Sequence, residues 1–375
     1  MANEFSYKGP KGGDKLGVGL EPTLVIDSFD TVTGEFKWTV TNNDDDISAT
    51  IYTYIEGFGI QSFSVVGKGG SKQFSESLLL GTDYVIKAYI MSDIDAEKTS
   101  PTVEDYYTTP IPIPGQVVFT SSGSFLVPLG VTSVSVVAVG GGAGGDHWNT
   151  YAHSGSGGGL GWKNNIAVTP GQSYSVVVGA GGAAFTPGYN GGNSYFINTS
   201  TVCGYGGLHQ NAPGGVFVGD GGGNGGHGST AGGNPSACGG GGGAGGYSGN
   251  GGDGGMGTVG DPSSTAGQGG AGGGGQGGIG DDGQASWGGG GGGVGILGEG
   301  SSGAAGGISG WGAQKNRGGG GSGGTGSGLT PTGGLYGAGG GGTNLLKSGG
   351  NGGNGIVRIM WGPGRSYPST NVGDQ

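Results

Sequence analysis

Residue types on which several protein classes depend are scarce in this sequence of 375 residues. Its two cysteines, Cys203 and Cys238, are too few for a disulfide scaffold, and they could pair or stay reduced. The chain has 14 lysines and arginines against 25 aspartates and glutamates, and its cations form no cluster. Because wrapping nucleic acid or lying on anionic lipid requires clustered cations, we expect neither partner.

Long apolar runs are missing as well. No segment approaches the ~18 consecutive apolar residues of a membrane span. The first residues, MANEFSYKGPKGG, lack the apolar stretch of a secretory signal. We therefore expect a protein that is made in the cytoplasm and does not insert into a membrane.

Side chains suited to catalysis are also rare. The chain has four histidines, and Glu299 is the single glutamate between residues 140 and 355. Enzymes need a nucleophile beside a base, or two carboxylates in a cleft. We therefore expect no enzyme activity and no cofactor.

Glycine is present in large excess and is unevenly distributed. It accounts for 108 of the 375 residues, whereas glycine makes up about 7% of the residues in an average protein. Only 15 glycines lie in residues 1–139, and 90 lie in residues 140–355. Acidic residues show the opposite distribution, because 17 of the 25 fall in residues 1–110. The composition predicts two domains of different construction.

Residues 18–110 predict a β-sandwich. Seven short β-like runs alternate with turn residues, and in one of them Phe36, Trp38 and Val40 alternate with polar residues. Seven such strands within about 90 residues are typical of a sandwich. The early Trp38, the segment GTDYVIKAY and the closing YYTTP resemble fibronectin type III and immunoglobulin-like domains. Residues 1–17 show no period and are expected to be a flexible or docking arm.

The segment TPIPIPG marks the domain boundary. Its alternating prolines lack backbone donors and predict a stiff linker over residues 111–115. A glycine-rich domain is expected over residues 116–362, followed by a C-terminal tail over 363–375. Strand-like patterns enclose this domain at both ends.

The glycine-rich domain is expected to be ordered. A glycine-rich chain is by default a flexible linker, but here aromatic residues interrupt the glycine runs and strands enclose them. Runs such as 239–243 and 288–293 suit the polyglycine II helix, which has three residues per turn and no internal hydrogen bonds. Their N–H and C=O groups would then bond to neighbouring runs. The predicted fold class is all-β: a β-sandwich, then packed polyglycine II helices framed by β-strands.

Polar and aromatic stretches separate the glycine runs and predict loop tips. Tyr, Trp, Ser and Asn in loops on a rigid scaffold make adaptable contact surfaces. Trp162 and Trp361 lie beside strand-like segments, so we expect them to pack at the end of the bundle. The candidate receptor contacts are Trp148, Tyr151, Tyr189, Trp287, Trp311 and Tyr336.

Residues 116–370 resemble a known kind of domain. The opening VFTSSGSFLVPLGVTSVSVVAVGGGAGG and the closing GGNGGNGIVRIMWGPGRSYPST are similar to glycine-rich domains of tailed-phage tail-fibre adhesins and receptor-binding virion proteins. The resemblance is strongest to phages of marine cyanobacteria. It implies recognition of a host surface by the distal loops, and it transfers no individual binding residue.

Other motifs favour simpler interpretations. Matches to G-x-G-x-x-G arise by chance among so many glycines, and none lies in a βαβ unit. GGDGGMG is a single copy of a calcium-binding repeat that must recur. Asp146, His147 and His153 could ligate a metal, but we interpret the two histidines as surface residues. Residues 44–46 and 281–282 are interpreted as solvated acidic turns, so no metal is expected.

These observations lead to one hypothesis and two alternatives. The chain is expected to be a phage tail-fibre protein of the virion, attached through residues 1–110 to other tail or fibre proteins. Its loops would bind a host glycan or an outer-membrane protein. The first alternative is a structural decoration protein of the capsid or tail. The second is an ice-binding protein, which the irregular aromatic interruptions disfavour.

Overall fold

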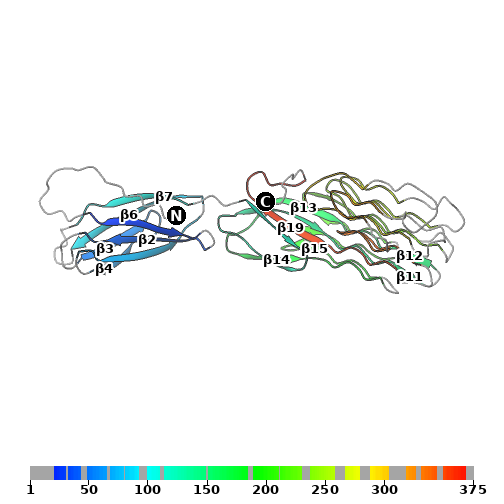
Figure 1. Cartoon of the computed structure of the whole chain (residues 1–375), viewed down its shortest axis with the longest axis horizontal. Helices are drawn as coiled ribbons and strands as arrows, with labels where there is room; N and C mark the ends of the chain where they lie inside the picture. The colour runs from blue at the N-terminus through cyan, green and yellow to red at the C-terminus, as the bar shows by residue number, and fades with distance from the viewer. Residues whose placement is uncertain are drawn as a thin grey trace. The chain divides into compact units, whose positions relative to one another are not determined.

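The computed structural model describes residues 21–30, 33–43, 49–65, 68–79, 81–92, 99–109, 114–148, 151–184, 189–210, 212–229, 237–257, 267–278, 288–303, 318–326, 331–343 and 349–368. Over these residues the chain is all-β and contains no α-helix, and every strand pair in its sheets is antiparallel (Figure 1). No helix there could span a membrane. The chain divides into two compact units, one largely before and one largely after residue 114.

Seven strands form the first unit, one within each β-like run of the sequence, so the predicted runs are confirmed. Three of them pair in the order β1-β2-β5 and four in the order β4-β3-β6-β7. The strands are β1 (Thr23–Phe29), β2 (Glu35–Thr41), β3 (Ala49–Ile55), β4 (Gln61–Val65), β5 (Ser71–Ser77), β6 (Asp83–Ser92) and β7 (Val103–Thr108).

Both sheets of the first unit contribute to one core centred on Trp38. Successive side chains on β2, β3 and β6 alternate between buried and half-buried, which is the period of two that the sequence shows. The ring of Trp38 stacks between Phe36 and Phe74, with centroid distances of 5.5 and 5.8 Å. Its Nε1 donates to Thr53 Oγ1 at 2.9 Å, so the buried indole N–H is satisfied.

The second unit begins and ends with strands. One five-stranded sheet has the order β18-β13-β10-β19-β8, the other has the order β17-β16-β15-β14-β9, and β11 pairs with β12 in a hairpin. The strands are β8 (Gly115–Phe119), β9 (Gly123–Leu126), β10 (Ser133–Val139), β11 (Asp146–Trp148), β12 (Tyr151–His153), β13 (Leu160–Ala167), β14 (Ser173–Val177), β15 (Ser194–Phe196), β16 (Val202–Gly204), β17 (Phe217–Val218), β18 (Gly221–Gly223) and β19 (Ile356–Trp361).

The last strand, β19, lies between β10 and β8 and therefore closes the unit. Its Arg358 is fully buried, and its guanidinium donates to Gln116 Oε1 on β8 and to the carbonyl of Ile296. A buried guanidinium needs such acceptors to offset its desolvation. The final strand thus connects the start of the unit to a turn more than 60 residues upstream of it.

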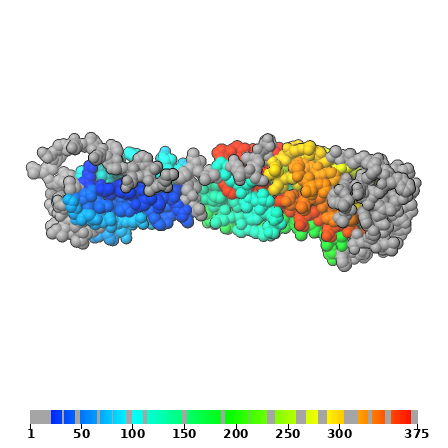
Figure 2. Space-filling model, in the orientation of Figure 1, coloured from blue at the N-terminus to red at the C-terminus, as the bar shows by residue number. Residues whose placement is uncertain are grey.

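Glycine-rich runs fill the space between these strands and the hairpin. The N–H groups of three successive residues in 140–145 donate to three different neighbouring runs, which are 156–159, 189–192 and 350–353. Residues three positions apart donate to the same run. The acceptors for residues 140–145, in order, are the carbonyls of Gly159, Gly192, Gly353, Ser156, Tyr189 and Gly350, at 2.8–2.9 Å. Stretches from early and late parts of the unit, drawn in cyan, yellow, orange and red, share the face seen in Figure 2.

Close approach of these runs requires glycine. A Cβ on Gly142 would lie 1.9 Å from the carbonyl oxygen of Ala338, and a Cβ on Gly157 would lie 1.9 Å from that of Gly243. Real Cβ atoms essentially never come within 3.0 Å of a heavy atom outside their own residue and its two chain neighbours. Backbone hydrogen bonds between runs therefore take the place that interdigitating side chains have in an ordinary core.

A conventional core joins the bundle to the sheets. Tyr247 Oη donates to the carbonyl of Gly295 at 3.1 Å and accepts from the N–H of Gly298 at 3.2 Å. Its ring stacks on Tyr367 at 5.8 Å. The buried residues are Val137, Val139, Leu160, Ala244, Tyr247, Val294, Ile356, Met360 and Tyr367.

Burial in this unit predicts loss of stability at alkaline pH. Burial raises the pKa of the Cys203 thiol from 9.0 to about 12, and it also raises the pKa of Tyr247 and Tyr367. The unfolded chain therefore releases these protons at lower pH than the folded chain, so stability falls as pH rises. We expect these three groups to leave the Tm unchanged below pH 9.0 and to lower it between pH 9.0 and about 12.

Calorimetry across this pH range tests that expectation. The variant Cys203→Ala removes one of the three groups, and we expect it to show a shallower decrease in Tm above pH 9.0. A Tm that stayed constant or increased up to pH 11 would contradict the assigned burial of these groups.

Candidate functional site

The glycine runs end beside one another. A series of backbone hydrogen bonds passes from Ser154 to Ser229, then to Gly240, Gly255 and Gly278, with N···O distances of 2.7–3.3 Å. Each of these residues lies within a few positions of the point where its run leaves the described part of the chain. Run ends that are far apart in sequence therefore share one end of the bundle.

Other runs end at the same place. Gly342 donates to Gly239, Gly341 donates to Pro331, and the N–H of Gly145 donates to Gly350. Residue 145 is followed directly by β11, and β11 and β12 lie at the end of the unit away from β14 in Figure 1. We call this the tip end. We use the name tip segments for the stretches outside the described residues that adjoin such run ends in the chain. They are 149–150, 185–188, 211, 230–236, 258–266, 279–287, 327–330 and 344–348.

Three of the candidate contact residues belong to the tip end. Trp148 and Tyr151 are paired positions of the β11–β12 hairpin. Tyr189 follows a tip segment directly, and 58% of its surface is exposed. Its carbonyl accepts the N–H of Gly144, which anchors its backbone to the bundle at 2.9 Å. Trp287 and Trp311 lie outside the described residues.

The structure does not bring Tyr336 to the tip end. Its N–H and carbonyl both bond to Val294, at 3.1 and 3.0 Å, and its side chain packs against the core that includes Tyr247 and Met360. Tyr336 lies in a turn on the strand side of the bundle because its run reverses there. Nothing in the local sequence distinguishes such a turn from a tip.

Trp162 and Trp361 pack where the sequence predicts. Trp162 Nε1 donates to the carbonyl of Tyr247 at 2.8 Å. Trp361 contacts Phe125 with a centroid distance of 5.7 Å. Both indoles lie beside strands of the second unit and serve packing.

The acidic and histidine candidates for a metal centre lie only partly within the described residues. Asp146 and His153 are paired positions of the hairpin, and Asp146 is only 2% exposed. His153, which we interpret from the sequence as a surface residue, is half-buried. Asp146 follows the buried Gly145 at the end of a run, and the bundle covers it. No group of three or more metal-ligating side chains occurs among the described residues. Residues 44–46 and 281–282 lie outside them.

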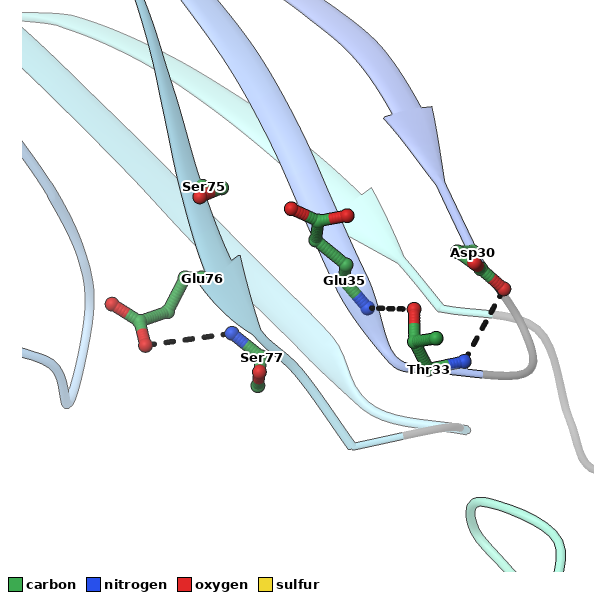
Figure 3. A pocket seen from close by; sticks show the side chains of 6 residues that line it. All are labelled: Asp30, Thr33, Glu35, Ser75, Glu76 and Ser77. Carbon is green, nitrogen blue, oxygen red and sulfur yellow. Dashed lines mark hydrogen bonds between the residues drawn. The ribbon is translucent and has the colours of Figure 1, made fainter.

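An open hollow in the first unit is acidic but carries no such group. Asp30 Oδ1 accepts the N–H of Thr33 at 3.2 Å, and Glu35 pairs with Lys37 at 3.0 Å. These are turn and surface contacts, and we assign the hollow no function. Its lining residues are Asp30, Thr33, Glu35, Ser75, Glu76 and Ser77 (Figure 3).

Asparagine side chains near the tips form contacts that the sequence patterns considered above did not reveal. Asn190, Asn193, Asn351 and Asn354 each accept a backbone N–H from an adjoining run. Their spacing of three residues within glycine is the signal that could have identified them.

Comparison with known proteins identifies one region. A family model described as a glycine-rich domain matches residues 120–362, which is more than half of the chain. No curated protein matches the sequence.

Proposed function

The chain belongs to the family of the glycine-rich domain, and from that premise we propose that it is a non-catalytic receptor-binding protein of a phage virion. The tip end would recognise a host glycan or outer-membrane protein. The single observation that carries the proposal is the convergence of run ends from across residues 140–355 at one end of a hydrogen-bonded bundle. Such a bundle presents many loops on one rigid base, as recognition surfaces require.

The bundle is proposed to consist of polyglycine II helices. Successive N–H groups of residues 140–145 turn to three different neighbours and return to the first after three residues. A helix with three residues per turn and no internal hydrogen bonds has this pattern. The contacts of Gly142 and Gly157 with neighbouring carbonyls supply the close packing that such helices need.

Tyr189 and the hairpin residues Trp148 and Tyr151 are proposed as receptor contacts because their backbone lies at the tip end. Aromatic side chains supply a large contact area at a low cost in conformational entropy. Trp287 and Trp311 remain proposed contacts from the sequence. We omit Tyr336 from the proposed surface because it packs against the core.

The first unit is proposed to attach the protein to the virion. Its two sheets and central Trp38 support the resemblance to fibronectin type III and immunoglobulin-like domains. Other tail or fibre proteins are the proposed partners of this N-terminal region. The proposed location is thus an exposed position on the virion, most simply a tail fibre.

Substitution of Tyr189 tests the recognition surface. We expect Tyr189→Ala to weaken adsorption of the purified chain to susceptible cyanobacterial cells about tenfold, because a central aromatic contact is worth 1–2 kcal/mol or more. The Tm should change little, since the side chain is exposed. The measurement is a binding isotherm on whole cells with a labelled protein.

Tyr106→Ala is the matched control, because Tyr106 is 72% exposed but belongs to β7 of the first unit. It should bind like the unmodified chain. If the unmodified, folded chain bound no host surface, the receptor-binding proposal would fail. Electron microscopy with a labelled antibody would then decide for a capsid or tail decoration protein.

A further inference from the structure

Three segments of the glycine-rich unit share the pattern Asn-Gly-Gly-Asx, in which Asx is Asn or Asp. They are residues 190–193, 250–253 and 351–354. All six Asn and Asp residues in them are exposed or half-buried, whereas most of the surrounding run residues are buried. The motif therefore belongs to runs on the surface of the bundle.

Every one of these six side chains accepts a backbone N–H from an adjoining run. The N···O distances are 2.7–3.0 Å. Within each motif, the two donors are also three residues apart in their own run. His209 and Gly206 donate to Asn190 and Asn193. Asn224 and His227 donate to Asn250 and Asp253, and Ala184 and Gly181 donate to Asn351 and Asn354.

The spacing of three follows from the geometry of the runs. Residues three apart face the same neighbour, as the bonds of residues 140–145 show, so both Asx side chains of a motif reach one adjoining run. The two residues between them face inward and must be glycine. A Cβ on Gly191 would lie 2.0 Å from the carbonyl oxygen of Gly141, and a Cβ on Gly352 would lie 2.0 Å from that of Gly142.

The residue after the first Asn bonds back to the same adjoining run. Gly191 donates to Gly207 at 2.9 Å, and Gly352 donates to Gly182 at 2.9 Å. The motif run thus accepts hydrogen bonds from the adjoining run through its Asx side chains and donates one to it through its backbone. A surface run has no further neighbour on its outer side, and the Asx oxygen supplies the acceptor that such a neighbour would provide.

In two of the three motifs, the hydrogen bond of the first Asn lies close to tip segments. Ala184 is the residue directly before 185–188, and its acceptor Asn351 comes shortly after 344–348. His209 and its acceptor Asn190 lie beside 211 and 185–188 in the same way. The roots of different tip segments are therefore joined to one another.

We propose that Asn-Gly-Gly-Asx is a clasp that fixes the register of adjoining surface runs and so positions the roots of the tip segments. The six Asx residues are positioning residues. The link from root position to recognition rests on the proposed function, whereas the clasp itself rests on the hydrogen bonds alone.

One of the three motifs shows which substitution keeps the hydrogen bond and can serve as a control. Asp253 occupies the second position of one motif and accepts the N–H of His227 at 2.7 Å, so a carboxylate serves as well as an amide. Asn→Asp keeps the acceptor oxygen at each position, and Asn→Ala removes it. The two substitutions therefore separate loss of the hydrogen bond from other effects of mutation.

Amide hydrogen exchange in the full-length chain tests the clasp. In the double variant N351A/N354A, we expect exchange at Ala184 and Gly181 to accelerate roughly tenfold, which corresponds to one net hydrogen bond each. Exchange at Gly206 and His209, held by a different motif, should not change. In N351D/N354D, all four amides should exchange as in the unmodified chain.

Unchanged exchange at Ala184 and Gly181 in the alanine variant would overturn the proposal, and so would equal acceleration in the aspartate variant. Cell adsorption is measured separately on the same proteins. Failure of the unmodified chain to adsorb would count against the receptor-binding function only. The exchange result is independent of it.

Discussion

Replacing Gly142 by alanine is expected to destabilise the second unit by about 3 kcal/mol or more. The new Cβ would lie 1.9 Å from the carbonyl oxygen of Ala338 and 2.3 Å from its carbon. These are backbone atoms, so no side chain can rotate away, and the two runs must separate. Separation also strains the bonds that Gly142 makes to Gly353 and Gly182, at 2.9 and 2.8 Å.

Chemical or thermal unfolding of the full chain measures this effect. A loss of about 3 kcal/mol in a unit of this size lowers the Tm by roughly 6–12 °C. Gly123→Ala is the matched control, because Gly123 lies in β9 of the same unit and its added Cβ would meet only Phe119, at an ordinary 3.5 Å. The control should remain within about 0.5 kcal/mol of the unmodified chain. Equal stability of both variants would refute the close packing of the runs.

Insertion of one glycine between Gly141 and Gly142 is expected to abolish the native bundle. In the proposed helix with three residues per turn, one extra residue rotates the rest of the run by about 120°. The donors from Gly142 to Gly145 would then point to the wrong neighbours. Each lost hydrogen bond costs about 1 kcal/mol net, and more where a buried group is left without a partner. Together with the displaced neighbours, the loss rivals the 5–15 kcal/mol that stabilises a typical domain.

Hydrogen exchange over residues 140–355 reports the outcome. We expect exchange in the insertion variant to approach that of an unfolded peptide, while β1–β7 of the first unit stay protected. The control is one glycine inserted between Gly232 and Gly233, in a tip segment between two runs. Added length there leaves the phase of both runs unchanged, so we expect the bundle to stay protected. Protection of the bundle in both variants would exclude three-residue helices.

Much of the fold could be predicted because some sequence patterns are local. The alternation around Phe36, Trp38 and Val40 requires only that one face of a strand be buried, and the seven strands of the first unit follow from it. The strands at the beginning and the end of the glycine-rich unit could be predicted in the same way. Ile356 to Trp361 forms β19 where the sequence returns to apolar and β-branched residues.

The candidate site could be predicted only in part. Aromatic interruptions mark places where a glycine run ends, but a run has two ends and composition does not distinguish them. Tyr189 lies at the tip end, whereas Tyr336 packs against the core on the strand side. The clasps were missed for a related reason, because Asn-Gly-Gly-Asx has meaning only once residues three apart are known to face one neighbour.

The sequence by itself determined that glycine replaces side-chain packing after residue 140, that strands enclose the glycine, and where the first unit has its strands. These properties depend on single residues and their immediate spacing. Only the tertiary structure decided which run lies beside which, that β19 lies between β10 and β8, and which ends of the runs converge. The physical reason is that glycine runs have no side chains to distinguish their neighbours. Their partners are selected by backbone hydrogen bonds between segments far apart in the chain, and by the few asparagines that clasp them.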